Sequence, residues 1–152
     1  SHRLHFRKPT PLFVQLFLFL STFLFLSGPQ SVSLQVSSTA PQQGDFHLAI
    51  YASAADYAVG KTIIGAIKTC NDKMVGFDIE LPTPGDYVIS GYHDVNGNGK
   101  LDFNIMGIPK EPYGFVRPPV TKWKEPTFTE ITTTVSTGKL KAKLQFKLWK
   151  EY

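Results

Sequence analysis

Residues 94–102 carry the side chains of this sequence that are best suited to hold a metal ion. Oxygen-bearing side chains stand at relative positions 1, 3, 5 and 9, with glycine at position 6 and a backbone carbonyl available at position 7. This spacing matches the first three-quarters of an EF-hand calcium loop, in which a tight turn aims alternate oxygens inward. Calcium takes about six to eight oxygen ligands. The expected ligands are the side chains of Asp94, Asn96, Asn98 and Asp102 and the carbonyl of Lys100.

The loop departs from an EF-hand at its end. Ile105 occupies the twelfth position, where an EF-hand has a bidentate glutamate, and no amphipathic helix follows. A remote acid or water must therefore complete the oxygen shell. We expect Glu111 to be that acid, because it is the next acid along the chain and no other precedes Glu125.

The same residues also permit an interpretation without a metal. The loop contains two Asn-Gly pairs, 96–97 and 98–99, and such pairs favour consecutive turns. Asp94 and Asp102 would then accept hydrogen bonds from nearby backbone N–H groups. Six matched features favour the calcium interpretation, and turns alone remain the alternative.

Carboxylates beside a histidine could also serve a hydrolase as general acid and base. The candidates are Asp94, Asp102 and Glu111, with His93 at the end of the preceding strand. Calcium would occupy the same carboxylates, and no nucleophile–base set is recognisable. We therefore predict a non-enzymatic protein with no catalytic residue. His93 is expected to form hydrogen bonds inside the fold, and Cys70, the single cysteine, to be a small buried hydrophobe.

The elements that must position the loop follow a period of two, in which apolar residues alternate with polar ones as in half-buried strands. The long segment 94–126 has no regular period, and residues 52–70 fit either a short helix or another strand with loops. This pattern predicts an all-β fold, an antiparallel β-sandwich of about seven strands. The expected strands span 32–37, 46–51, 74–81, 86–92, 128–135 and 140–148.

The last of these strands places lysines on one face and apolar residues on the other. Such a strip could bind an anionic surface, or it could be a solvated face that blocks edge-to-edge pairing of strands. We favour the second interpretation, because the strip holds nearly all the basic excess of the domain. The lysines are Lys139, Lys141, Lys143 and Lys147.

The N-terminus has the pattern of an export signal. A basic stretch precedes an uncharged apolar run, 12–26, that is short for a spanning helix. We expect residues 1–30 to be a cleaved signal peptide or, alternatively, a retained membrane anchor, and residues 31–152 to be a single secreted or periplasmic domain. That domain has 152 − 30 = 122 residues and a net charge of 13 − 12 = +1. Near-neutrality argues against nucleic-acid binding.

Three stretches of the chain resemble a family of small secreted bacterial proteins classed as a domain of unknown function. The stretches are 81–94, 96–102 and 106–115, with the pattern HDxNxNGKLD followed by GIPxEPYGF. The resemblance implies the fold and the compartment but no activity, and it places Glu111 in the same constellation as the loop. The strand that follows Pro84-Gly85 is also similar to those of transthyretin-like sandwiches.

We therefore expect a secreted, non-enzymatic β-sandwich whose calcium-binding loop presents a binding surface to a protein or glycan partner. The Pro-rich stretch after the loop contains aromatic residues for such a surface, although they could equally pack as a lid on the core. A membrane-anchored accessory subunit of a larger complex is the alternative, and membrane association is expected only if the leader is retained. The aromatic residues are Tyr113, Phe115, Trp123 and Phe128.

Overall fold

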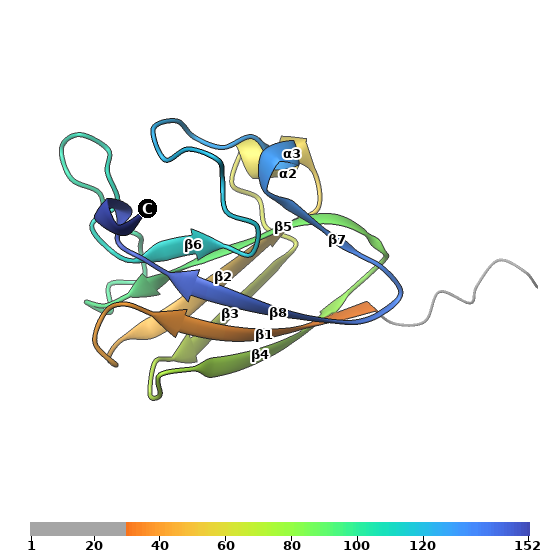
Figure 1. Ribbon diagram of the computed structural model, residues 1–152, viewed down its shortest axis with the longest axis horizontal. Helices are drawn as coiled ribbons and strands as arrows, with labels where there is room; N and C mark the ends of the chain where they lie inside the picture. Colours follow the sequence, from red (N-terminus) through yellow and green to blue (C-terminus); the bar gives the residue numbers. More distant parts are fainter. Residues whose placement is uncertain (1–29) are drawn as a thin grey trace, which may run out of the picture.

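The computed structural model describes residues 30–152, which form a mostly β fold with eight strands in two sheets and a few short helices (Figure 1). The strands are β1 (Gln30–Ser38), β2 (Asp45–Tyr51), β3 (Ile64–Thr69), β4 (Val75–Leu81), β5 (Gly85–Asp94), β6 (Tyr113–Phe115), β7 (Thr132–Val135) and β8 (Gly138–Phe146). The helices are α2 (Ala54–Ala58), α3 (Phe128–Ile131) and the 3₁₀ turn η1 (Trp149–Glu151).

The strands divide into a three-stranded sheet, β4-β1-β8, and a five-stranded sheet in which β3-β2-β5-β6 lie in order and β7 pairs with β5. All pairs are antiparallel except β1 with β8, which run parallel from Gln30 beside Gly138 to Ser38 beside Phe146. The expected antiparallel arrangement therefore holds for every strand pair except this one, where it was wrong. Nothing in the alternation of one strand specifies the direction of its neighbour, so the pattern could not show this.

One apolar core lies between the two sheets, and the alternating residues of both sheets face it. In β1 the residues Val32, Leu34 and Val36 are fully buried, while the residues between them are partly or fully exposed. Phe46 of β2 meets Phe146 of β8 edge to face, with ring centroids 5.3 Å apart. The cluster contains residues from both sheets, so burial of apolar area holds them together.

Two segments differ from the expected strands. Residues 52–70, for which helix and strand were both open, contain both, because α2 precedes β3. The expected strand over 128–135 was half wrong, since its first four residues form α3 and only Thr132–Val135 pair with β5. The helical turn buries Ile131 completely. It also brings the ring of Phe128 within 6.4 Å of the Tyr57 ring.

The final strand agrees with the edge interpretation except at Lys147, which follows β8, is partly buried and pairs through its backbone with Tyr113 of β6. β8 is an edge of the three-stranded sheet, and Lys139, Lys141 and Lys143 are all exposed. Lys139 contacts the Asp78 carboxylate of β4 at 3.1 Å. Both edges of this sheet thus present charge to solvent.

The leader prediction, residues 1–30, lies outside the described part of the chain except for its last residue. Among residues 30–152, no helix is long and apolar enough to span a membrane.

Candidate functional site

Asp94 is placed by the geometry of β5 and by a neighbouring turn. It is the last residue of β5 and is 1% exposed. The turn between β1 and β2 packs so closely on it that a Cβ atom at Gly44 would lie 2.0 Å from the Asp94 carbonyl oxygen. Gly44 also has a φ of 65°, a conformation that favours glycine. A residue without a side chain is required here, and it fixes where the loop leaves the sheet.

The Asp94 carboxylate organises the first half of the loop. Its two oxygens accept backbone N–H groups from Asn98 at 3.1 Å and from Gly99 at 2.7 Å. The Nε2 atom of His47, on the adjacent strand, lies 3.5 Å from the same carboxylate. Gly99 has a φ of 78°, which confirms the sharp turn expected at this position. A buried carboxylate is tolerated here because N–H donors surround it.

A second cluster joins the two ends of the loop. Oδ2 of Asp102 accepts both side-chain amides, from Asn96 at 2.7 Å and from Asn98 at 2.9 Å. These two donors hold the pKa of the Asp102 carboxyl below its usual value. The Oδ1 atoms of the same asparagines accept the backbone N–H groups of Asn98 and Lys100, respectively. Four of the predicted residues therefore converge, since Asn98 connects Asp94 to Asp102.

Glu111 reaches the loop as predicted, but it binds the backbone. It is 6% exposed, and its Oε1 and Oε2 accept the N–H groups of Val95 at 2.9 Å and Asp102 at 3.2 Å. One carboxylate thus bridges the first and last turns of the loop. The N–H group of Lys110 donates to the Asp102 carbonyl and closes the same junction.

The arrangement contains the hydrogen bonds of the turn interpretation, and calcium remains a prediction. Within residues 30–152, no three His, Cys, Asp or Glu side chains form a group suited to a metal ion. A cation at this loop would therefore depend on amide and carbonyl oxygens as well as carboxylates. Calcium accepts such mixed oxygen sets.

His93 points away from the carboxylates. Its ring is completely buried between the sheets, where Nδ1 lies 2.8 Å from Ser38 Oγ and Nε2 lies 2.5 Å from the Gln43 carbonyl. Phe46 packs against it edge to face at 4.8 Å. The prediction that His93 forms hydrogen bonds within the fold is confirmed, and its ring is not placed to exchange protons with Asp94.

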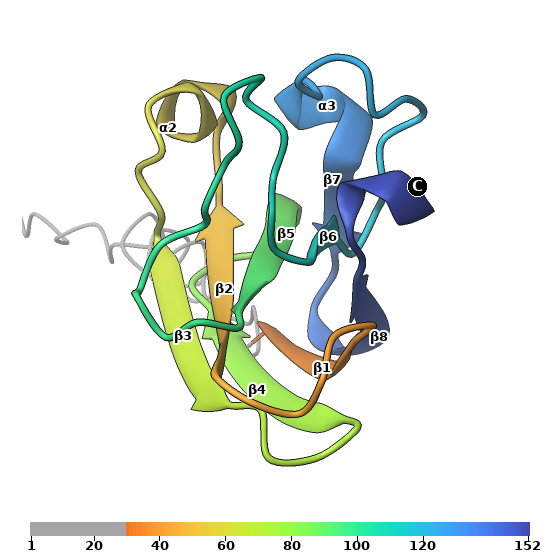
Figure 2. The same cartoon turned by 90° about the vertical axis from the view of Figure 1, so that its left-hand side faces the viewer.

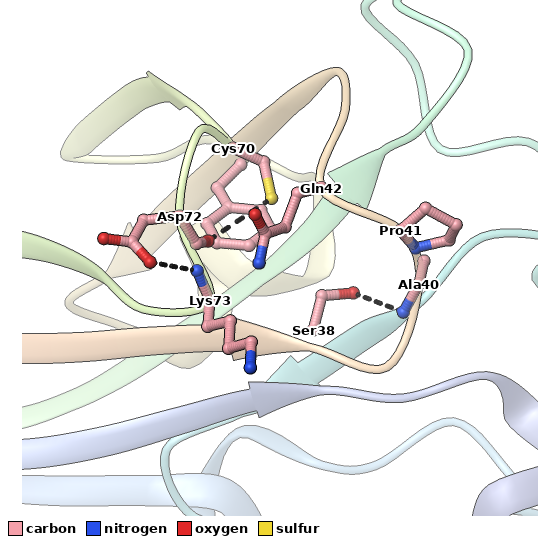
Figure 3. Close-up of a pocket in the computed structure, with 8 residues that line it drawn as sticks. Ser38, Ala40, Pro41, Gln42, Cys70, Asp72 and Lys73 are labelled. Carbon is pink, nitrogen blue, oxygen red and sulfur yellow. Dashed lines mark hydrogen bonds between the residues drawn. The ribbon is translucent and has the colours of Figure 1, made fainter.

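Cys70 lines a hollow beside the β1–β2 turn, shown with its neighbours in Figure 3. The side chain is 3% exposed and belongs to the apolar core, as predicted. Burial raises the pKa of its thiol, which disfavours the nucleophilic thiolate. The hollow is also lined by Ser38, Ala40, Pro41, Gln42, Asp72 and Lys73.

An open groove of about 730 Å³ lies beside the loop. One wall is the continuation of the loop, including Phe103 and Met106, and the other is the segment 122–126. Of the four aromatic residues expected at a binding surface, Trp123 is 78% exposed. The other three are half-buried, so the surface and lid interpretations each describe part of the set. Further lining residues are Tyr57, Tyr113, Phe115 and Trp149.

Sequence reasoning missed several of these lining residues. Phe103 and Met106 are apolar residues within a turn-rich segment, and that contrast was a usable signal for exposure. Tyr57 and Trp149 come from elements whose structure the pattern did not define. Trp149 meets Trp123 edge to face at 5.0 Å, and the Lys122 ammonium lies 4.3 Å from its ring centroid.

Two sheets around a single core, with a hydrogen-bonded Asp/Asn loop beside an aromatic groove, define a small β domain elaborated at one end. The chain belongs to the family of uncharacterized proteins conserved in bacteria (DUF2141), which matches residues 34–143. The matched region includes the whole loop and Glu111. Searches of curated proteins and of solved structures gave no match.

Proposed function

We propose that the protein is a secreted, non-enzymatic β-sandwich of transthyretin-like type whose 94–102 loop binds calcium and supports a binding surface. One observation carries the proposal. The chain passes directly from Asp102, in the oxygen-rich cluster, to Phe103, in the groove wall. An ion that orders the loop would therefore order one wall of the groove.

The proposed ligands are the oxygens of Asp94, Asn96, Asn98, Asp102 and the Lys100 carbonyl. Calcium would replace the side-chain N–H groups of Asn96 and Asn98 as the partner of the Asp102 carboxylate. Both side-chain amides would then turn their oxygen atoms toward the ion. Glu111 completes the proposal as a further ligand. Each of its oxygens accepts one N–H and keeps a second lone pair.

The charge of the site sets the expected affinity. Two loop carboxylates and Glu111 give at most three negative charges, and the bidentate glutamate of an EF-hand is replaced by Ile105. We expect a dissociation constant on the order of 10⁻⁴ to 10⁻³ M, the range of extracellular modules. Calcium would then act as a structural ion in a calcium-rich medium.

Thermal melting with calcium and with chelator tests the metal. Wild type should melt at a higher temperature in millimolar calcium, because an ion that binds only the folded state adds stability. Asp102→Asn should abolish that increase, whereas Asp72→Asn, an exposed carboxylate outside the loop, should retain it. A wild-type melting temperature that ignores calcium would remove the metal and leave the hydrogen-bonded turns.

The groove is the proposed surface for a protein or glycan partner. Its exposed Trp123 offers a ring face to apolar or sugar C–H groups, and the nearby Lys124 and Glu125 offer polar contacts. Glycan and peptide arrays should be probed with wild type and Trp123→Ala, each with calcium and with chelator. Binding that is unchanged by Trp123→Ala would place the partner elsewhere.

A further inference from the structure

Most of the exposed apolar side chains gather on one side of the molecule. Among residues 30–152, six of the ten large apolar side chains that are exposed lie at the end of α2 or in the loops 95–112 and 116–127. These three segments all contribute to the groove, and they reach the same side of the molecule in both views (Figures 1 and 2). Such a concentration of apolar surface marks an interaction site. The six residues are Val59, Phe103, Ile105, Met106, Val120 and Trp123.

The first loop, 95–112, has a tip formed by a tight turn with two apolar residues at its centre. The N–H group of Gly107 donates to the Asn104 carbonyl at 3.0 Å, so Ile105 and Met106 occupy the two central positions. Ile105 is 105% exposed and Met106 is 77% exposed. Turn centres favour Gly, Pro, Asn, Asp and Ser, whose side chains suit the turn backbone. Neither the turn nor the core therefore accounts for this apolar pair.

The backbone of this tip is hydrogen-bonded within the tip itself. The Asn104 N–H group donates to the Ile108 carbonyl at 2.9 Å. The Oδ1 atom of Asn104 accepts the N–H groups of Met106 at 2.9 Å and Ile108 at 3.0 Å. A loop can enter an apolar medium only where its backbone polar groups have partners, because that medium offers none. These N–H groups meet the condition without water.

The second loop, 116–127, has the same combination of apolar side chains and paired N–H groups. Val120 is 93% exposed and Trp123 is 78% exposed. The Val120 N–H group donates to Glu130 Oε1 at 3.1 Å, and the Trp123 N–H group donates to Thr121 Oγ1 at 3.2 Å. Tryptophan is enriched at the boundary between membrane and water, because its ring is apolar and its indole N–H is polar.

The two loops also carry positive charge. Residues 95–126 contain five basic and three acidic residues, 5 − 3 = +2, whereas the remainder of residues 31–152 has 8 − 9 = −1. Two of the three acids, Asp102 and Glu111, are at least partly buried and accept hydrogen bonds within the fold. Glu125 is the one exposed acid of this segment, beside four exposed bases. Basic residues are attracted to anionic lipid headgroups. The four bases are Lys100, Lys110, Arg117 and Lys124.

We propose that the tips of the two loops dock on the surface of an anionic phospholipid bilayer. Ile105, Met106 and Trp123 would enter the boundary between headgroups and acyl chains, roughly 5–10 Å deep, while the bases remain among the headgroups. A protein partner would need a fitted pocket for each isolated side chain, whereas a fluid bilayer accepts apolar side chains from separate loops. The contact belongs to the folded domain, and it requires neither the leader nor an ion in the 94–102 loop.

Tryptophan fluorescence of the full chain tests the docking, because both tryptophans of the sequence, Trp123 and Trp149, line the groove. In chelator, vesicles of phosphatidylglycerol and phosphatidylcholine should shift the emission to shorter wavelength, and lipids brominated on their acyl chains should quench it. The shift should be absent in Trp123→Phe. Vesicles of phosphatidylcholine alone should bind at least tenfold more weakly, because they lack the anionic headgroups.

Three results would overturn the proposal. The first is an emission that does not respond to phosphatidylglycerol, which includes vesicle association caused by the apolar leader alone. The second is equal binding to both kinds of vesicle. The third is a shift that persists in Trp123→Phe. If the vesicles have no effect but the arrays detect a partner that needs Trp123, the loops serve that partner and the groove keeps its proposed function.

The two methionines of the sequence provide a matched pair of variants. Met106→Ser should weaken binding to phosphatidylglycerol vesicles about tenfold, because it removes an apolar side chain that leaves water on docking. Serine suits a turn, so the tip should keep its fold. Met74→Ser should leave binding unchanged, since Met74 is 55% exposed in the turn between β3 and β4, on the opposite side of the molecule (Figures 1 and 2). Equal effects of the two substitutions would contradict docking through the loop tips.

Discussion

The core between the sheets and the 94–111 segment are stabilised in different ways. The core contains apolar side chains from both sheets, and its contacts are spread over many residues. The 94–111 segment has an ordered shape although most of residues 96–107 are exposed. Two buried carboxylates, Asp94 and Glu111, accept the backbone N–H groups that hold it.

This difference determines which changes each region tolerates. Apolar packing has little directional preference, so its stability depends on volume and buried area. A carboxylate that accepts two N–H groups cannot be replaced by a group of similar size without leaving a donor unpaired. The core should therefore respond to changes of size, and the loop to changes of hydrogen-bonding chemistry.

The largest expected effect is in the core. Phe146→Ala should lower the free energy of unfolding by about 3–5 kcal/mol, because it leaves a cavity against Phe46. Chemical denaturation measures the loss. Phe103→Ala, at a 56% exposed ring in the groove wall, is the matched control and should cost no more than about 0.5 kcal/mol. Equal losses would mean that the loop end contributes apolar stability comparable with that of the core.

The next effect separates the loop from the core by chemistry alone. Glu111→Gln keeps the side-chain volume but places an amide N–H group against a backbone N–H donor. We therefore expect the free energy of unfolding to fall by about 1–3 kcal/mol. Amide exchange should accelerate at Val95 and Asp102, the two donors. Glu125→Gln, an exposed acid in the groove, should change neither quantity. In calcium titrations by calorimetry, Glu111→Gln should also bind more weakly than Glu125→Gln.

A smaller effect is expected at high pH at the border of the groove. Burial, followed by the charge of Glu125, raises the pKa of Tyr57 to about 12 from an ordinary value of 10.0. The folded state therefore holds this proton more tightly than the unfolded state. Its contribution to stability is complete below pH 10 and is lost as pH rises toward 12. Tyr57→Phe should flatten the decline in melting temperature over that interval, and an unchanged slope would contradict the shift.

The smallest effect concerns Asp102. Its lowered pKa means that the folded state favours the carboxylate, so the contribution to stability is present above the unfolded pKa and is lost as pH falls through the folded value. Asp102→Asn should remove the contribution of this carboxyl to the loss of stability in acid. Any acid dependence that arises elsewhere in the fold should stay unchanged. NMR measures the titration midpoint of Asp102 directly from the chemical shifts of its side-chain carbons. A midpoint at the ordinary carboxyl pKa would exclude the two hydrogen bonds that Asn96 and Asn98 donate to it.

The strands were predictable where burial imposes a period of two. β1, β2, β4 and β8 alternate, whereas β5 buries the three successive residues 87–89, and the boundaries of all five strands were expected to within a few residues. The helical turn before β7 was missed because the β-branched and aromatic residues of 128–135 favour a strand, although the spacing of three between Phe128 and Ile131 fits one side of a helix. Its conformation depends on a tertiary contact with Tyr57, which no local pattern contains.

The candidate site was predictable in membership and only partly in arrangement. The spacing of Asp94, Asn96, Asn98 and Asp102 predicts that they converge, and they do. Glu111 was expected near the loop. That it bridges the N–H groups of Val95 and Asp102 depends on the pairing of the following strand, β6, with β5. The type of a side chain shows which hydrogen bonds it can accept or donate, whereas the fold determines which group becomes its hydrogen-bond partner.

The parallel pairing of β1 with β8 has a consequence for how the chain acquires its fold. The paired residues Gln30 and Gly138 are 138 − 30 = 108 positions apart, so this sheet is built from contacts of very high sequence separation. Such contacts slow folding, because a long loop must close before they form. A nascent chain that still lacks β8 has β1 paired on one side only. We therefore expect the domain to complete its fold only after β8 has been synthesised, and to need protection from aggregation until then.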